Sequence, residues 1–253
     1  MYRYFIKMSY CGKDFHGWQI QPNAITIQEK VNNALSLILR NEINVVGAGR
    51  TDTGVHASEF YTHFDIQKEI ETNLTLNQLK YKLNSFLPYS IAIDKIFRVG
   101  KNTHSRFDAI SRTYKYYVAM KKNPFIYDSS YQLMKHLDIN KMNKAAAVLF
   151  EHNDFTSFSK LHTQTNNNLC TIMKAEWSVE NDCLVFEIKA NRFLRNMVRA
   201  IVGTLIEIGL GKLEVEDINR IICCKKRSEA GYSVPAKGLF LTNIEYPNSI
   251  FGK

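Results

Sequence analysis

Apolar and polar residues alternate or recur with helical spacing along the chain, and the pattern predicts two successive sets of elements. Residues 2–10 alternate as a β-strand does, and Thr26 with Glu29 forms a capping box that begins a helix containing Val31 and Leu35. The rest of this half reads as strands at 43–46 and 60–66, a helix over 76–86 that ends before Pro88, and a strand at 91–99. The predicted order is βαββαβ.

The second half repeats this order without repeating the sequence. Its predicted elements are a strand at 112–120, a helix at 140–150, strands at 169–179 and 183–190, a helix at 193–208, a shorter helix near 214–224 and a strand at 239–246. We therefore predict an α+β fold of two ferredoxin-like units, residues 1–105 and 106–253, whose sheets join across a central catalytic cleft. The Ser-, Thr- and Asn-rich stretch 153–168 predicts a mobile polar loop over that cleft.

Composition narrows the class of protein. Among 253 residues, 33 are Lys or Arg and 24 are Asp or Glu, and the resulting formal charge of +9 favours polyanionic partners such as nucleic acid. Because no apolar run reaches the ~18 residues of a membrane span and the first ten residues alternate, we predict a cytoplasmic protein without a membrane segment.

Cysteine and histidine do not indicate a metal site. The five cysteines include no C-x-x-C pair, so we expect reduced thiols. His56 and His63 are seven residues apart on a predicted strand, which puts them on opposite faces. We predict no metal ligands.

The most unusual segment is GAGRTDTGVHA, residues 47–57, which places an arginine and Asp52 among three glycines after a strand. A dinucleotide-binding loop would have its third glycine at position 52 and would open a helix, whereas here an alternating strand follows. Nicotinamide or flavin binding is therefore disfavoured. Asp52 alone could be an ordinary turn residue, so a catalytic role needs partners elsewhere.

Two further segments supply such partners. In SRTYKYYV, residues 111–118, Tyr114 lies between Arg112 and Lys115, as in a stacking platform for an unpaired base; the alternative is that Tyr114 and Tyr116 face the core. The stretch 98–122 favours a phosphate-facing surface, because it contains one acid, Asp108, against Arg98, Lys101, Arg106, Arg112, Lys115, Lys121 and Lys122.

Arginines on the helix predicted at 193–208 form the third segment. Arg192, Arg195 and Arg199 are spaced by three and four residues, so they would share one helix face. Like charges so arranged call for anions, such as a phosphate backbone and Asp52, although a plain basic surface stripe is the alternative. Leu239 begins the last strand and could wall a pocket.

These segments together resemble the TruA family of tRNA pseudouridine synthases over essentially the whole chain. The family's signature loop stands at 49–57, its Arg-x-Tyr-x-Tyr strand at 112–116, its Phe-Leu-x-x-Met-Val-Arg helix at 193–199 and its Gly-Leu strand at 238–239. The N-terminal pattern that ends in Gly-Trp-Gln stands at 10–19. Several motifs in the family's order are more specific than any one of them.

The resemblance implies a homodimer without metal or organic cofactor that converts uridine to pseudouridine at positions 38, 39 and 40 of the tRNA anticodon arm. It makes Asp52 the catalytic carboxylate, stacks Tyr114 on the target base and pairs Arg199 with the Asp. We expect substrate contacts from Arg50, Thr51, Gly54, His56, Arg112, Arg192, Arg195 and Leu239.

Two alternatives and one departure from the family pattern remain. A ferredoxin-like module that binds or folds RNA without turnover would share the aromatic strands, but it would not require an Asp near phosphates. A nucleotide-dependent oxidoreductase is disfavoured by the loop. Where the family commonly has a compact Gly-Pro-Thr, this chain has residues 231–234, Gly-Tyr-Ser-Val, which leaves the outer pocket undefined.

Overall fold

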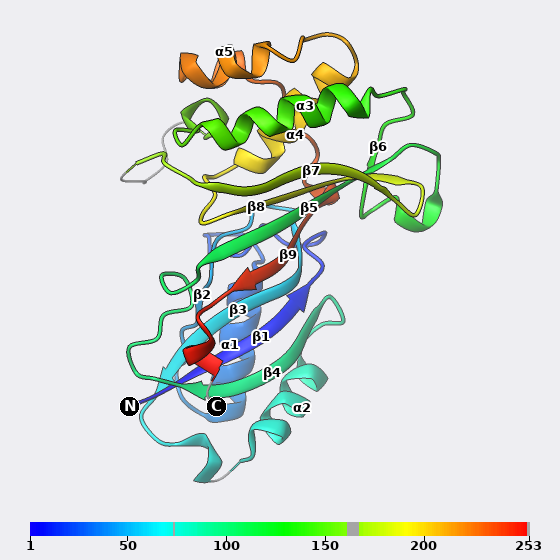
Figure 1. The fold of residues 1–253 in the computed structure, drawn as a ribbon. Coiled ribbons are helices and arrows are strands. Elements are labelled where there is room, and N and C mark those ends of the chain that lie inside the picture. The colour runs from blue at the N-terminus through cyan, green and yellow to red at the C-terminus, as the bar shows by residue number, and fades with distance from the viewer. Residues whose placement is uncertain (73, 161–166, 252–253) are drawn as a thin grey trace. The chain divides into compact units, whose positions relative to one another are not determined.

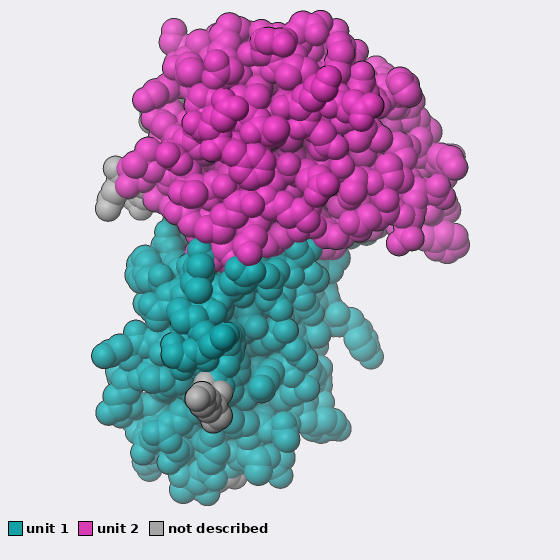
Figure 2. All heavy atoms as spheres, in the orientation of Figure 1, with its two compact units in different colours: residues 1–110, 241–253 teal, residues 111–240 magenta. Residues whose placement is uncertain are grey.

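The structure, a computed structural model, describes residues 1–72, 74–160 and 167–251. The chain packs into two compact units, shown in two colours in Figure 2: unit 1 comprises Met1–Ile110 with Leu241–Lys253, and unit 2 comprises Ser111–Phe240. This division differs from the predicted domains 1–105 and 106–253, because the C-terminal segment belongs to the first unit. The fold class is α+β, as predicted.

Unit 1 has the predicted order of elements along the chain (Figure 1). The order is β1 (Tyr2–Tyr10), α1 (Ile27–Leu39), β2 (Val46–Gly47), β3 (His56–Ile66), α2 (Leu76–Phe86) and β4 (Ile91–Val99), with β9 (Leu239–Glu245) added from the C-terminus. In the sheet, β1 pairs antiparallel with both β3 and β4, β2 pairs antiparallel with β3, and β9 lies next to β3. Helix α2 packs along β4 and against α1.

The strand predicted at 43–46 is largely wrong. Ile43 and Val45 are buried as expected, but their backbone N–H groups donate to side chains of α1, namely Ser36 Oγ at 2.9 Å and Asn32 Oδ1 at 2.9 Å. Because these donors are satisfied by a helix instead of a strand, only Val46–Gly47 joins the sheet.

Aromatic packing explains why the C-terminal segment belongs to unit 1. The Tyr246 ring contacts Phe5 and Tyr61 edge-on, with centroids 5.8 and 5.1 Å apart, and its hydroxyl donates to the Ser105 carbonyl. The backbone N–H of Ile244 donates to the Glu59 carboxylate at 3.1 Å. These contacts cover part of one face of β1, in which Tyr4, Phe5 and Ile6 are fully buried.

Unit 2 is a mixed sheet with three α-helices on one side (Figure 1). Its strands are β5 (Ser111–Ala119), β6 (Tyr131–Gln132), β7 (Ile172–Glu180) and β8 (Cys183–Ala190), and its helices are α3 (Ile139–Val148), α4 (Met197–Gly209) and α5 (Asp217–Cys224). Strand β8 lies between β5 and β7 and is antiparallel to both, while β6 runs parallel to β5. Helix α4 is almost wholly buried.

Short 3₁₀-helices complete the two units. They span Ile70–Thr72, Pro124–Ile126, Leu149–Glu151, Thr156–Phe158, Arg227–Glu229, Ala236–Gly238 and Asn248–Phe251. The one at Thr156–Phe158 lies in the stretch predicted as a mobile loop, and there Phe155 and Phe158 are buried in the core. Residues 161–166 of that predicted loop lie outside the described residues. No helix in the described part of the chain is long and apolar enough to cross a membrane.

The helix predicted at 193–208 begins four residues later than expected. Asn196 adopts φ +69°, a left-handed conformation, directly before Met197. Upstream, the Arg195 carbonyl accepts from the Lys160 N–H, and the Asn191 side chain accepts from the Thr171 N–H. Because other segments hydrogen-bond to residues 191–195, that stretch is a loop, and the predicted helix face shared by Arg192, Arg195 and Arg199 does not exist.

A buried histidine makes the stability of unit 1 depend on pH. His63 Nδ1 lies 2.8 Å from Ser105 Oγ, and burial, followed by the charge of Arg3, lowers the pKa of His63 from 6.5 to about 4. His104 adds to the lowering, while Asp65 and Asp108 oppose it. Between pH 6.5 and 4 only the unfolded chain binds this proton, so stability falls as pH falls through that window.

We predict that His63→Asn flattens this acid dependence. From pH 7 to pH 4.5 the wild-type free energy of unfolding should drop on the order of 2 kcal/mol more than that of His63→Asn, after allowance for solvent screening. Urea denaturation at stepped pH measures the difference, and the exposed His136→Asn is the matched control. Equal slopes for wild type and His63→Asn would contradict the assignment.

Candidate active site

The loop that carries Asp52 lies between β2 and β3 in unit 1. Together with the first residue of β3 it contains five of the predicted site residues, which are Arg50, Thr51, Asp52, Gly54 and His56. Asp52 is half-buried, whereas Arg50 is exposed. The loop enters from Ala48, whose N–H donates to the Tyr61 carbonyl at 2.8 Å, and leaves directly into β3. A carboxylate is therefore presented on a short irregular segment directly before an inner strand of the sheet.

The segment that follows β1 braces this loop from one side. The Trp18 N–H donates to the Thr51 carbonyl at 3.2 Å, and the Tyr10 hydroxyl shares a 2.9 Å hydrogen bond with Thr51 Oγ1. Gly17 adopts φ +85°, and a Cβ there would lie 2.5 Å from the Thr51 carbonyl oxygen. The predicted N-terminal pattern 10–19 thus positions the residue next to Asp52.

A tight turn fixes the backbone on the other side of Asp52. The Val55 N–H donates to the Asp52 carbonyl at 3.1 Å, and Gly54 has φ +78° at the third position of this four-residue turn. That conformation favours glycine. Gly54 also donates its N–H to the Phe15 carbonyl at 3.4 Å. The contacts of Gly54 within unit 1 therefore support the shape of the loop.

His56 is buried at the start of β3. Its Nδ1 accepts from the Gly12 N–H at 3.2 Å, and a Cβ on Gly12 would lie 2.0 Å from the Val55 carbonyl oxygen. Gly12 therefore contacts the end of the Asp52 loop in two ways, through its close approach to Val55 and through its hydrogen bond to His56. His56 is thus placed to lock the loop to the segment after β1.

In unit 2, Tyr114 and Tyr116 differ in burial although both lie on the same face of β5. Tyr116 is fully buried and donates its hydroxyl to the Pro235 carbonyl at 2.8 Å. Tyr114 is half-buried, and its ring meets Phe193 edge-on with centroids 5.1 Å apart. The alternative that both tyrosines face the core is confirmed for Tyr116 only.

The loop 191–196 carries two of the predicted arginines and is pinned to β5. Arg112 donates Nη1 to the Asn191 carbonyl at 2.9 Å, which joins the strand before Tyr114 to this loop. Arg192 donates Nη1 to Asn167 Oδ1 at 3.2 Å. Phe193 was visible in the sequence only as a helical residue, so its contact with Tyr114 could not be foreseen.

Arg199 lies in the first turns of α4 and is tied to the segment before β9. Its Nε donates to the Val234 carbonyl at 2.7 Å, and its own carbonyl accepts from the Val234 N–H at 3.3 Å. The next carbonyl, that of Pro235, takes the Tyr116 hydroxyl. Leu239 is buried, and the preceding Gly238 lies against the Tyr116 ring, which a Cβ would approach to 2.8 Å.

Several cations of the basic stretch 98–122 are neutralised within their own unit. Arg98 forms an ion pair with Glu69, and Lys115 Nζ lies 2.9 Å from Glu180. Lys121 is 3.6 Å from Asp182. These three side chains therefore pair with acids that are distant in the sequence, and the phosphate-facing surface over this stretch stays a prediction.

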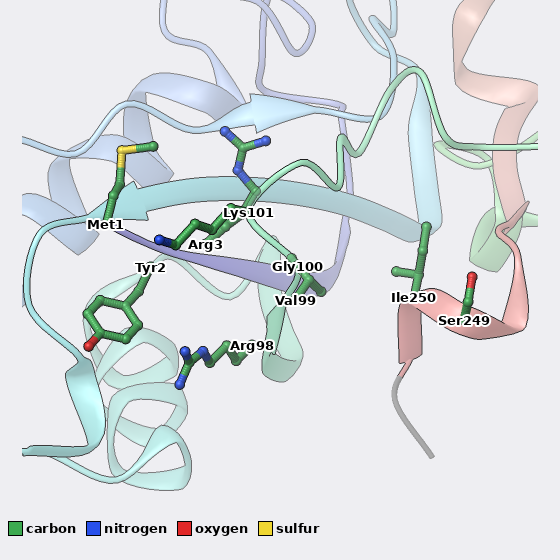
Figure 3. A pocket seen from close by; sticks show the side chains of 9 residues that line it. All are labelled: Met1, Tyr2, Arg3, Arg98, Val99, Gly100, Lys101, Ser249 and Ile250. Atoms are coloured by element: carbon green, nitrogen blue, oxygen red, sulfur yellow. The ribbon is translucent and has the colours of Figure 1, made fainter.

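A pocket of about 560 Å³ opens in unit 1 away from the Asp52 loop (Figure 3). Its described lining consists of Met1, Tyr2, Arg3, Arg98, Val99, Gly100, Lys101, Ser249 and Ile250, and includes no predicted site residue. Arg3 donates to both oxygens of Asp65, at 2.8 and 2.7 Å, so the charge of this wall is partly balanced. The presence of this pocket therefore does not identify the candidate active site.

Metal ligands do not cluster in the described residues, where no group of three or more His, Cys, Asp or Glu could hold an ion. Cys170 and Cys183 are buried, and Cys11, Cys223 and Cys224 are exposed; all five are free thiols. Reduced thiols stay a prediction from the sequence.

Comparison with known proteins identifies the family. A family model described as tRNA pseudouridine synthase matches residues 145–247. The tRNA pseudouridine synthase A of Bacteroides fragilis is 52% identical over 250 residues, covering 98% of each chain, and that of Parabacteroides distasonis is 51% identical over 251 residues, covering 99% and 98%. The chain belongs to the tRNA pseudouridine synthase family.

A more distant relative supports the same assignment. The tRNA pseudouridine synthase A of Francisella tularensis subsp. holarctica is 36% identical over 253 residues, covering 99% of this chain and 96% of the relative. The family model covers Arg199 and residues 230–235 before β9, whereas the relatives also span the Asp52 loop and β5. Membership in the tRNA pseudouridine synthase family therefore rests on both units.

We predict that the Asp52 loop of this tRNA pseudouridine synthase depends on Gly17 for its shape. Gly17→Ala should lower the free energy of unfolding by about 1–3 kcal/mol, because the residue has a positive φ and its Cβ would collide with the Thr51 carbonyl. Gly49→Ala is the matched control, since a Cβ there meets nothing within 4 Å. Thermal and urea unfolding compare them, and equal stability of the two variants would contradict this account.

Proposed function

We propose that this chain isomerises uridine to pseudouridine at positions 38, 39 and 40 of the tRNA anticodon arm, with Asp52 as the catalytic carboxylate. Family membership gives the reaction and the class of RNA, because the relatives are named as tRNA pseudouridine synthases. The observation that carries the residue assignment is the half-buried Asp52 in a loop braced through Thr51, Gly54 and His56.

The reaction requires one correctly positioned carboxylate. It breaks the N1–C1′ bond of uridine, turns the freed uracil and joins C5 to C1′, so no group is added and there is no net redox change. An aspartate can attack C1′ or C6, or it can take a proton from C2′, and each route requires a carboxylate held in a fixed position beside the flipped nucleotide. A loop whose backbone is hydrogen-bonded on both sides of Asp52 meets that demand.

Unit 2 supplies an aromatic ring and a cation for the same chemistry. The half-buried Tyr114 ring is supported edge-on by Phe193, which suits it to stack on the target base and to take the C5 proton with its hydroxyl. Arg199 supplies a positive charge that suits it to pair with a carboxylate. Its guanidinium plane is set by the bond from Nε to Val234.

The remaining predicted contacts divide into two kinds. The proposal gives Arg50, Arg112, Arg192 and Arg195 to the RNA backbone, and of these Arg50 and Arg195 are exposed. Thr51, Gly54 and His56 contribute by holding the loop in which the substrate is met. Leu239, buried at the start of β9, would keep the pocket dry.

We further propose two ferredoxin-like units, a homodimer and a cytoplasmic location. The antiparallel neighbours β4-β1-β3-β2 of unit 1 support the first. An anticodon arm is large compared with one domain, which supports a second subunit that adds basic surface. Light scattering in solution tests the dimer.

We predict that Asp52→Asn abolishes turnover while tRNA binding remains. Purified protein is incubated, without added cofactor, with unmodified tRNA, and pseudouridine is mapped at nucleotide resolution. The wild type should modify positions 38–40, and Asp52→Asn should be slower by at least about 10³-fold, because the amide is neither nucleophile nor base.

The matched control is Asp182→Asn. Asp182 is exposed at φ +64° in the β7–β8 turn, a conformation that asparagine tolerates. Full turnover by Asp52→Asn would overturn the catalytic assignment. Binding without turnover by the wild type on any tRNA would favour the non-catalytic RNA-binding module instead.

We predict that Tyr114→Phe and Tyr114→Ala separate the two roles of the tyrosine. Phe keeps the ring against Phe193 but removes the hydroxyl, so kcat should fall about 10²-fold with little change in KM. Ala removes the stacking surface as well, so KM should rise in addition. Unchanged kcat for Tyr114→Phe would exclude the hydroxyl from proton transfer.

A further inference from the structure

The segment at 230–235, here called the strap, is held tightly on helix α4. The Gly231 N–H donates to Thr204 Oγ1 at 2.9 Å, and a Cβ on Gly203 would lie only 1.8 Å from the Tyr232 carbonyl oxygen. Backbone therefore rests directly on the helix. This is the segment in which the chain departs from the compact family pattern.

Arg227 clamps the strap from outside. Its Nη1 donates to the carbonyls of Ala230 at 3.2 Å and Gly231 at 3.0 Å, and its Nη2 donates to Ser233 Oγ at 2.8 Å. All three acceptors are neutral, and burial lowers the pKa of Arg227. Burying part of a guanidinium without a carboxylate among these acceptors costs desolvation free energy. A role as a surface charge does not explain that cost.

The strap is hydrogen-bonded to the start of α4 at two points. Ser233 Oγ also accepts from Asn196 Nδ2 at 2.7 Å, and Asn196 is the left-handed residue directly before the helix. One residue further, the Val234 carbonyl accepts from Arg199 Nε. The Ser233 hydroxyl therefore accepts hydrogen bonds from both Arg227 and Asn196. The carbonyl that orients Arg199 belongs to the next residue, Val234.

We propose that Arg227 is a positioning residue for the isomerisation, which clamps the strap so that the Val234 carbonyl sets the orientation of the Arg199 guanidinium. This inference rests on the proposed function, in which Arg199 supplies charge to the reaction. An arginine bonded through Nε has its plane fixed, and its two terminal nitrogens then present donors in a defined direction. A strap that shifts would turn that plane.

The test compares Arg227→Gln with Arg220→Gln in steady-state kinetics on unmodified tRNA. Arg220 is an exposed arginine on α5, ion-paired with Asp217 and Glu229, and its substitution should leave kcat within twofold of wild type. Arg227→Gln should lower kcat about 10- to 100-fold with KM within about twofold, because a small misplacement away from the chemistry affects the reaction more than binding. Arg227→Lys should recover part of the loss.

A second background separates positioning from general support of the fold. Lysine has no counterpart of Nε, so in Arg199→Lys the strap has no guanidinium to orient. Arg227→Gln should then lower kcat by less than about twofold further. A loss that multiplies fully in the Arg199→Lys background would overturn the proposal, as would wild-type kcat for Arg227→Gln.

If Arg227→Gln does not fold, Ser233→Ala keeps the proposal testable. It removes the hydroxyl that both Arg227 and Asn196 contact, and it should lower kcat in the same direction and also lose its effect in Arg199→Lys. The two proposals fail differently: full activity of Asp52→Asn rejects the proposed function, whereas loss of turnover in Asp52→Asn together with a fully active Arg227→Gln rejects only the clamp.

Discussion

The structure around Asp52 depends on backbone packed directly against backbone. The segment after β1 approaches the Asp52 loop so closely that Gly12 and Gly17 have no room for a side chain, and Trp18 lies where a Cβ on Gly47 would be. Hydrogen bonds to the Thr51 carbonyl and hydroxyl then hold the residue beside the aspartate. An irregular loop would otherwise sample many conformations, and ordering each of its residues costs about 1–2 kcal/mol.

The same device recurs in unit 2 with different residues. Gly203 and Gly238 let the strap and the start of β9 lie on α4 and on the Tyr116 ring. The two successive carbonyls at 234 and 235 then take one donor from the helix and one from the strand β5. In each unit, glycines permit the contact, and polar groups make it specific.

The sequence predicted most of the regular elements because their patterns are local. β1, α2 and β4 have the predicted bounds, since alternation and a helical stripe before Pro88 are complete within each segment. The strand at 43–46 and the start of the α4 helix were wrong. In both, side-chain or backbone partners from other segments replace the local hydrogen bonds, and no window of the sequence contains those partners.

The site was predictable as a set of motifs and not as a set of contacts. The residues from Arg50 to His56 are consecutive, so they stay together in any fold, whereas Phe193 beside Tyr114 and Val234 beside Arg199 join positions 79 and 35 residues apart. The ion pairs of Arg98 and Lys115 were not foreseen for the same reason, because their partners Glu69 and Glu180 lie far from them in the chain.

The desolvation cost of Arg227 supports its role as a positioning residue. A guanidinium that is partly removed from water and has neutral acceptors relies on hydrogen bonds to offset its desolvation, and an apolar residue that packed against the strap would avoid that cost. An apolar residue would not, however, tie two carbonyls and a hydroxyl into one geometry. A destabilising guanidinium is reasonable where the position of a short segment matters more than stability. The strap is such a segment, because it carries the Val234 carbonyl.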